Sequence, residues 1–109
     1  MPIKTGVDIV YIPRIEKILK NSDAVRRLFH SLELKNTAPE HLAGIIAAKE
    51  AFFKVFEERP RWLEIEVKTK KNGKPTFVLN KKYEKMIKSI DVSISHDHDY
   101  AIACVVVEV

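Results

Sequence analysis

The order of the predicted elements indicates an α+β fold, in which one long helix packs on a mostly antiparallel sheet. Two pairs of strand-like segments are each joined by a short turn, which makes antiparallel neighbours. The longest apolar stretch with helical spacing lies between these pairs, at residues 39–58. Because a sheet and an amphipathic helix must bury their apolar faces against each other, we expect one domain over residues 1–109.

The first half of the chain is predicted to hold one strand and three helices. Residues 3–10 are rich in β-branched side chains, and Pro13 is suited to the first turn of a helix. Asn21-Ser22-Asp23 is a helix stop and a new N-cap, and the long helix begins at Pro39. The predicted elements are a strand at 3–10, helices at 13–20 and 24–29, a loop at 30–38 and the long helix at 39–58.

The second half is predicted to hold two hairpins separated by a short helix. Asn72-Gly73 is a two-residue hairpin turn signal between alternating segments. Asp97-His98-Asp99 is predicted as the tight turn of the second hairpin. The predicted elements are strands at 62–70 and 75–79, a polar helix at 81–88, and strands at 90–96 and 100–109.

Composition limits the cellular location and the kinds of partner that we expect for this protein. Hydrophobic residues make up 46% of the 109 residues and charged residues 31%, the profile of a globular protein, and no apolar run has the length of a membrane span. The N-terminus lacks the pattern of a signal peptide, so we expect a cytoplasmic protein without membrane contact. The net charge of +4 favours an anionic partner. Cys104, the one cysteine, lies in an apolar run and is predicted to be a core residue.

A lysine and a glutamate lie side by side in the otherwise apolar stretch IIAAKEAFFK at 45–54. Buried charges are costly unless they are paired or bind a ligand. Glu50 and Lys54 share a helix face, on which Ala43 and Ala47 would let a ligand or another chain approach. The alternative is an ordinary surface Glu–Lys pair.

Asp8 is the single charged residue in the apolar part of the first strand. Gly6 lies on the same face and is expected to leave open space beside the carboxylate. The alternative is an aspartate that caps the turn before Pro13. Two carboxylates on separate elements, Asp8 and Glu50, suit Mg²⁺, which takes one or two protein carboxylates together with phosphate oxygens. Lys54 would then contact phosphate.

Two further segments carry polar side chains. In SISHDHDYA at 93–101, His96 is expected to hydrogen-bond a ligand or the backbone, since neighbouring strand side chains diverge and no third cluster completes a zinc site. In NGKP at 72–75, the backbone amides and Lys74 are candidates to face a phosphate. There is no Walker loop and no dinucleotide fingerprint.

Taken in order, these motifs resemble the 4′-phosphopantetheinyl transferases, and most closely the small bacterial holo-acyl carrier protein synthases. The matching segments cover nearly the whole chain: G-x-D at 6–8, A-x-K-E-A-x-x-K at 47–54, N-G-K-P at 72–75 and S-I-S-H-x-x-x-Y-A at 93–101. The resemblance implies the transferase fold and transfer of the 4′-phosphopantetheine arm of coenzyme A to a serine of apo acyl carrier protein. Adenosine 3′,5′-bisphosphate is the other product, and Mg²⁺ is the cofactor.

The resemblance also implies roles for individual residues. Asp8 and Glu50 correspond to the metal ligands and Lys54 to the phosphate-contacting lysine, and these three are the expected catalytic residues. The residues expected to bind the coenzyme are Lys54, His96, Gly73, Lys74 and Pro75. The residues expected to contact the carrier are Arg14, Arg26 and Arg27. The resemblance further implies a homotrimer with active sites between subunits.

The sequence departs from this family in three places, and one of them is the segment at 30–39, which is short for the family. Ile45 and Ile46 follow Gly44, where the family often has an arginine, and no glycine-rich loop follows Lys54. One alternative is therefore a relative that binds coenzyme A or a carrier without transfer. A second alternative is a small basic nucleic-acid-binding domain, supported by the lysines of 68–88. This second alternative lacks interleaved aromatic residues and gives no role to Asp8 or Glu50, so we expect no nucleic-acid partner.

Overall fold

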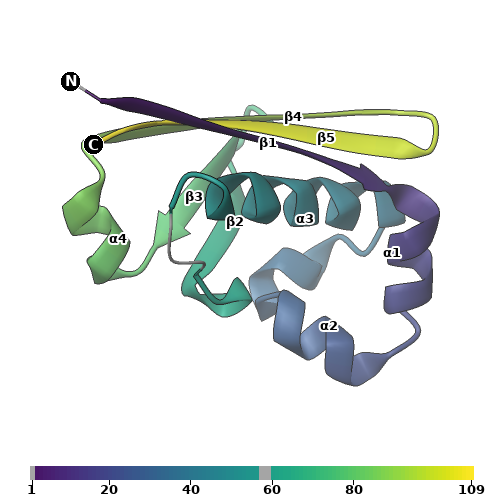
Figure 1. Cartoon of the computed structure of the whole chain (residues 1–109). Helices are drawn as coiled ribbons and strands as arrows, with labels where there is room; N and C mark the ends of the chain where they lie inside the picture. Colours follow the sequence, from purple (N-terminus) through teal and green to yellow (C-terminus); the bar gives the residue numbers. More distant parts are fainter. Residues whose placement is uncertain (1, 57–59) are drawn as a thin grey trace.

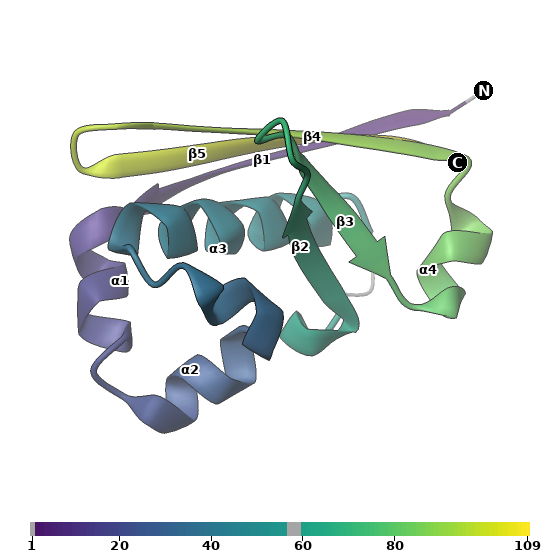
Figure 2. The same ribbon diagram turned by 180° about the vertical axis from the view of Figure 1, so that it is seen from behind.

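The computed structural model describes residues 2–56 and 60–109 (Figure 1). A three-stranded sheet forms one layer, α3 lies against its inner face, and α2 lies on the opposite side of α3 (Figures 1 and 2). The elements in chain order are β1 (Ile3–Tyr11), α1 (Ile12–Ile18), α2 (Ser22–Leu28), the 3₁₀ helix η1 (Ser31–Lys35), α3 (Pro39–Phe53), the 3₁₀ helix η2 (Trp62–Glu64), β2 (Ile65–Thr69), β3 (Pro75–Leu79), α4 (Lys81–Met86), β4 (Ser89–Asp97) and β5 (Tyr100–Glu108).

The strands form two antiparallel sheets, which confirms the predicted fold class. The larger sheet has the order β1-β5-β4, and β2 pairs with β3 in a separate hairpin. Figure 2 shows this hairpin crossing beside α3. The chain ends lie side by side, and Val109 N–H donates to the Pro2 carbonyl at 3.2 Å. Among the described residues, no helix is both long and apolar enough to cross a bilayer.

Helix α3 is the centre of the core. Every residue from Leu42 to Lys49, and Ala51 to Phe53, is buried, because the sheet covers one side of α3 and α1, η1 and β2 cover others. A helix that is apolar nearly all round requires such a position. Ala43 and Ala47 are 0% exposed, so the prediction that these alanines admit a ligand or another chain is wrong.

Gly6 sets the distance between β1 and α3. A Cβ atom at this position would lie 1.9 Å from the Ala51 carbonyl oxygen. The space that we expected beside Asp8 is therefore filled by the helix backbone, and the prediction of an open space is wrong. The absence of a side chain lets the last turn of α3 approach the strand.

The outer face of the larger sheet is apolar over two of its strands. Strand β5 alternates strictly, so that Ala101 faces the core while Cys104, opposite Val7, is exposed. The prediction that Cys104 is a core residue is wrong, because an apolar run that alternates in this way buries only every second residue. The large exposed apolar residues of β1 and β5 are Ile3, Val7, Ile9, Tyr11, Tyr100, Ile102 and Val106.

The limits of several elements differ from those predicted. Helix α3 ends at Phe53, because the amides of Val55 and Phe56 bond three residues back rather than four. The predicted end at residue 58 lies outside the described residues. The 30–38 segment, predicted as a loop, contains η1, whose Glu33 side chain accepts a hydrogen bond from the His30 N–H. The first three residues of the strand predicted at 62–70 form η2 instead.

We predict that Gly6→Ala destabilises the protein, because the added methyl group would meet backbone rather than a movable side chain. Overpacking of this kind costs about 2 kcal/mol or more, and for a chain of this size the melting temperature should fall by about 10 °C. Thermal unfolding followed by circular dichroism measures the change. Thr5→Ala, on the exposed face of the same strand, is the matched control and should shift the melting temperature far less. An unchanged melting temperature in Gly6→Ala would contradict the close packing of α3 on β1.

Candidate functional site

Asp8 and Lys54 meet at the C-terminal end of α3. The Lys54 ammonium donates to the Asp8 Oδ1 atom at 3.2 Å and to the Val7 carbonyl at 2.9 Å. The Asp8 side chain is 17% exposed and that of Lys54 is 55% exposed. The contact follows from the close approach at Gly6, because Asp8 lies two residues further along the same face of β1. The result is a partly open carboxylate with a cation beside it.

Glu50 lies one turn before Lys54, which caps α3 by donating its N–H to the Glu50 carbonyl at 3.2 Å. Glu50 is only partly buried, in contrast to its neighbours on both sides. We call Asp8, Glu50 and Lys54 the carboxylate end. The described residues contain no group of three or more His, Cys, Asp or Glu side chains that could hold a metal. The donors here are the carboxylates of Asp8 and Glu50, which suit Mg²⁺ when phosphate oxygens complete its shell.

Three other predicted residues gather elsewhere. His96, Gly73 and Pro75 line a groove of about 360 Å³ together with His41 and Gly44 of α3. We call this the hairpin groove. His96 lies near the end of β4, as predicted, and His41 on the first turn of α3 had not been singled out from the sequence. No residue of the carboxylate end lines this groove.

The turn at 72–75 differs from the phosphate cradle that we expected. The amide of Gly73, whose φ is +87°, donates to the Lys70 carbonyl, and the Lys74 amide donates to the Asn72 side chain. Both N–H groups are thus used inside the turn. The Lys74 ammonium binds the Asp91 carboxylate at 2.9 Å. The expectation that these amides face a phosphate is therefore wrong, although Gly73 and Pro75 do line the groove.

The carboxylate end and the hairpin groove lie at opposite ends of α3. Gly44 faces the Ile94 side chain of β4, whereas Ala51 meets Gly6 of β1, so the helix runs under the sheet from one edge strand to the other. Gly44 and Lys54 are about 15 Å apart along the helix axis at 1.5 Å per residue. Within one chain, the structure does not bring His96 together with Asp8, Glu50 and Lys54.

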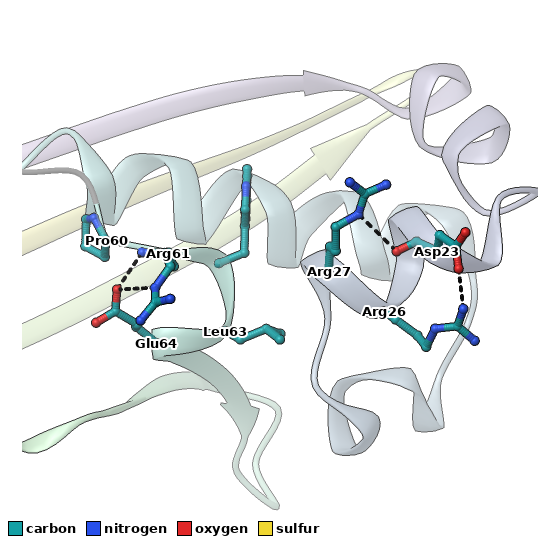
Figure 3. Close-up of a pocket in the computed structure, with 8 residues that line it drawn as sticks. Asp23, Arg26, Arg27, Pro60, Arg61, Leu63 and Glu64 are labelled. Atoms are coloured by element: carbon teal, nitrogen blue, oxygen red, sulfur yellow. Dashed lines mark hydrogen bonds and ion pairs between the residues drawn. The ribbon is translucent and has the colours of Figure 1, made fainter.

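The predicted carrier-binding arginines are exposed but fall on two helices. Arg14 lies on α1, while Arg26 and Arg27 lie on α2. Arg26 forms an ion pair with Asp23, and Arg27 Nε donates to the Asp23 carbonyl at 3.4 Å. A hollow of about 1090 Å³ lies between α2 and η2 (Figure 3), and its lining consists of Asp23, Arg26, Arg27, Pro60, Arg61, Trp62, Leu63 and Glu64. Arg14 is not part of it.

A buried ion pair is the main feature that the sequence analysis missed. The Lys49 ammonium lies 2.8 Å from Glu33 Oε1, and both side chains are 0% exposed. It also lies 5.9 Å from the centre of the Phe29 ring. Burial lowers the pKa of Lys49, and its hydrogen bond with Glu33 opposes that decrease. The signal was present, since Lys49 shares the apolar stretch with Glu50, but its partner lies 16 residues away in a segment predicted as a loop.

Comparison with known proteins agrees with this fold. A model of the 4′-phosphopantetheinyl transferase superfamily matches residues 4–105. The holo-[acyl-carrier-protein] synthase of Caldanaerobacter subterraneus is 41% identical over 118 residues, covering 94% of this chain and 92% of that protein. The synthase of a Geobacillus species is 38% identical, covering 99% of this chain and 98% of that protein. The crystal structure of the Helicobacter pylori synthase with coenzyme A has a TM-score of 0.88 at 33% identity, covering 95% of this chain and 99% of that one.

The chain therefore belongs to the 4′-phosphopantetheinyl transferase superfamily, a class of enzymes. Within this class, the relatives that match it over nearly their full length are holo-[acyl-carrier-protein] synthases. The resemblance seen in the ordered motifs is confirmed. The glycine-free segment after Lys54 includes residues 57–59, which lie outside the described residues.

We predict that Lys74→Ala raises the pKa of Asp91. The hydrogen bond from Lys74, followed by that from the Val92 N–H, holds the pKa of Asp91 below its usual value. The stability that this pair contributes is present above the unfolded-state pKa and is lost as pH falls through the folded-state pKa. Carboxyl-detected NMR titration of both proteins measures the shift.

Glu64 is the internal control for this titration. Its pKa is also below the usual value, mainly because the Arg61 N–H donates to it, with a smaller contribution from Asn80. The Glu64 titration should be the same in both proteins. Equal Asp91 titration curves in the two proteins would refute the contact between the turn and β4.

Proposed function

We propose that this protein transfers the 4′-phosphopantetheine arm of coenzyme A to a serine of apo acyl carrier protein in a Mg²⁺-dependent reaction. The products are holo acyl carrier protein and adenosine 3′,5′-bisphosphate. The observation that carries the proposal is the contact between Asp8 and Lys54 beside Glu50. It supplies carboxylates and a cation at one place, in a chain whose relatives are named synthases.

The residues of the carboxylate end would divide the chemistry between them. The carboxylates of Asp8 and Glu50 would hold Mg²⁺, which neutralises charge on the diphosphate when it is bound. A lysine ammonium has three N–H donors, and within the described part of the chain Lys54 uses two of them, on Asp8 and Val7. The third would bind a phosphate oxygen of the departing bisphosphate and stabilise its charge.

The transfer forms a bond between the serine oxygen and the phosphorus next to the pantetheine arm. The bond from that phosphorus to the bridging oxygen of the diphosphate breaks, and the electron pair leaves with the bisphosphate. The seryl proton must pass to a base, because an alkoxide is a far better nucleophile than a hydroxyl group. The candidates for this base are the Glu50 carboxylate and a water held beside it.

A ring of three copies would complete the site. The carboxylate end lies at the β1 edge of the sheet and the hairpin groove at the β4 edge. If the β1 edge of one copy meets the β4 edge of the next, the two halves come together, and such head-to-tail contacts close into a ring. The exposed apolar residues of β1 and β5 would also be covered. This supports the homotrimer that the family resemblance implies.

The carrier would dock on the arginine-bearing helices. Arg14, Arg26 and Arg27 are all exposed, and the chain has a net charge of +4. Acidic partners are steered toward basic surfaces at low ionic strength. We propose these three arginines as carrier contacts, with coenzyme A in the hairpin groove of the adjacent copy.

Intact-mass spectrometry of apo acyl carrier protein with coenzyme A and Mg²⁺ tests the reaction directly. We expect a metal-dependent mass gain of one phosphopantetheine arm. Glu50→Gln should keep the fold and lower kcat by about 100-fold or more, the usual contribution of a catalytic base or ligand. Glu84→Gln, an exposed glutamate on α4, is the matched control and should leave kcat unchanged.

Two other results would lead to different functions. Calorimetric binding of coenzyme A without any mass gain would indicate a relative that only binds. If the protein neither binds coenzyme A nor adds mass to the carrier, but binds DNA or RNA in a salt-sensitive way, the nucleic-acid alternative would be supported. Full activity of Glu50→Gln would show that Glu50 is not part of the active site.

We predict that two inactive variants restore each other when their subunits mix. Glu50→Gln damages the carboxylate end, and His96→Ala damages the hairpin groove. A site that takes its carboxylate end from a His96→Ala chain and its groove from a Glu50→Gln chain therefore has both halves intact. Random 1:1 assembly after joint refolding should restore about a quarter of the sites of a closed ring. Light scattering should show three copies. The variant carrying both substitutions on one chain is the control, and it should restore nothing when mixed with either. No restoration by the two single variants would refute a site between subunits.

A further inference from the structure

Lys49 and Glu33 form a fully buried ion pair that the proposed reaction does not use. Their charged atoms lie 2.8 Å apart, and both side chains are 0% exposed. A buried ion pair is often no more stabilising than apolar residues of similar size. The presence of these charges therefore calls for an explanation other than stability.

The pair joins four separate segments by hydrogen bonds. The Lys49 ammonium donates to the Leu28 carbonyl at 2.8 Å, at the end of α2. Glu33 Oε1 accepts from the His30 N–H at 2.7 Å, and Oε2 accepts from the Val67 N–H of β2 at 2.8 Å. The Val67 N–H points away from β3, the strand that pairs with β2. Glu33 therefore accepts a hydrogen bond that the backbone of a further strand would otherwise accept. All the bonds converge on two side chains.

Three of these four segments, α3, β2 and α2, carry part of the proposed site. Lys49 directly precedes Glu50, and successive residues point about 100° apart on a helix, so anchoring Lys49 toward α2 sets the rotation at which Glu50 is presented. Val67 lines the hairpin groove and belongs to the hairpin that carries Gly73. Leu28 ends the helix that carries Arg26 and Arg27.

We infer that Lys49 and Glu33 are positioning residues for the transfer reaction, which hold the last turn of α3, the β2–β3 hairpin and α2 in one fixed arrangement. Neither side chain touches a substrate, because both are enclosed. The inference rests on the proposed function, since a fixed arrangement matters only if all three segments act in one reaction. A displacement of about 1 Å between reacting groups can cost about 100-fold in rate.

The double variant Lys49→Met/Glu33→Gln tests the inference. It removes both charges together, so no unpaired charge remains in the core. We expect it to fold and to lower kcat at least tenfold, while the KM for coenzyme A changes less than about threefold, because the groove residues themselves are intact. A wild-type kcat in the folded double variant would overturn the inference.

Val107→Ala separates positioning from loss of stability. Val107 is fully buried in β5 and has no hydrogen bond to the pair. Both proteins are assayed well below their melting temperatures. Val107→Ala should lose stability and retain kcat. An equal decrease of kcat in Val107→Ala at an equal loss of melting temperature would also overturn the inference.

A second variant, Glu33→Asp, and a second measurement, amide NMR, also test the positioning role. Should the double variant not fold, Glu33→Asp keeps the charge but shortens the side chain by one methylene, and it should lower kcat at least tenfold. Backbone amide NMR spectra should shift at both Glu50 and Gly73 in either variant, and not in Val107→Ala. Shifts confined to residues that touch the pair would overturn the inference. Failure of the wild-type protein to modify a carrier would instead refute the proposed function, and the amide shifts would still decide whether the pair links the segments.

Discussion

The packing of α3 across the three-stranded sheet is the constraint on which the rest of the structure depends. The helix can lie this close only because Gly6 has no side chain where the Ala51 carbonyl approaches. That approach brings Lys54 within hydrogen-bond distance of Asp8. The same packing buries almost every residue of α3 and leaves Glu50 partly accessible on its last turn. A local backbone contact thus determines where the charged side chains of the site can meet.

The direction of α3 also explains why the candidate site is divided. One end of the helix contacts the β4 edge and forms the hairpin groove, and the other contacts the β1 edge and forms the carboxylate end. A buried helix keeps these regions apart in one chain, because close-packed cores do not deform to bring distant surfaces together. A head-to-tail assembly joins them without any change inside the subunit. The apolar outer face of β1 and β5 is consistent with such an assembly.

The buried pair of Lys49 and Glu33 shows how charges can serve a fold without adding much to its stability. Both charged groups have partners, including the backbone of α2 and β2. The geometry is therefore specific where apolar packing would tolerate several arrangements. The pKa of Lys49 is lowered by burial even though Glu33 opposes the decrease, which means that desolvation outweighs the pairing. Such a group is retained at a cost, and positional precision is a physical reason for keeping it.

The sequence by itself determined the class of fold and the order of the α-helices and strands, and it led to the proposal that Asp8, Glu50 and Lys54 act together. These follow from local signals, namely hydrophobic period, turn residues such as Asn72-Gly73, caps such as Asn21, and ordered motifs. Tertiary structure alone decided that Cys104 faces outward, that the helix backbone fills the space beside Gly6 and that Lys49 is paired with Glu33. It also decided that His96 lies apart from Asp8. Each depends on which surfaces meet in space, and contacts between residues far apart in the chain leave no periodic pattern along it.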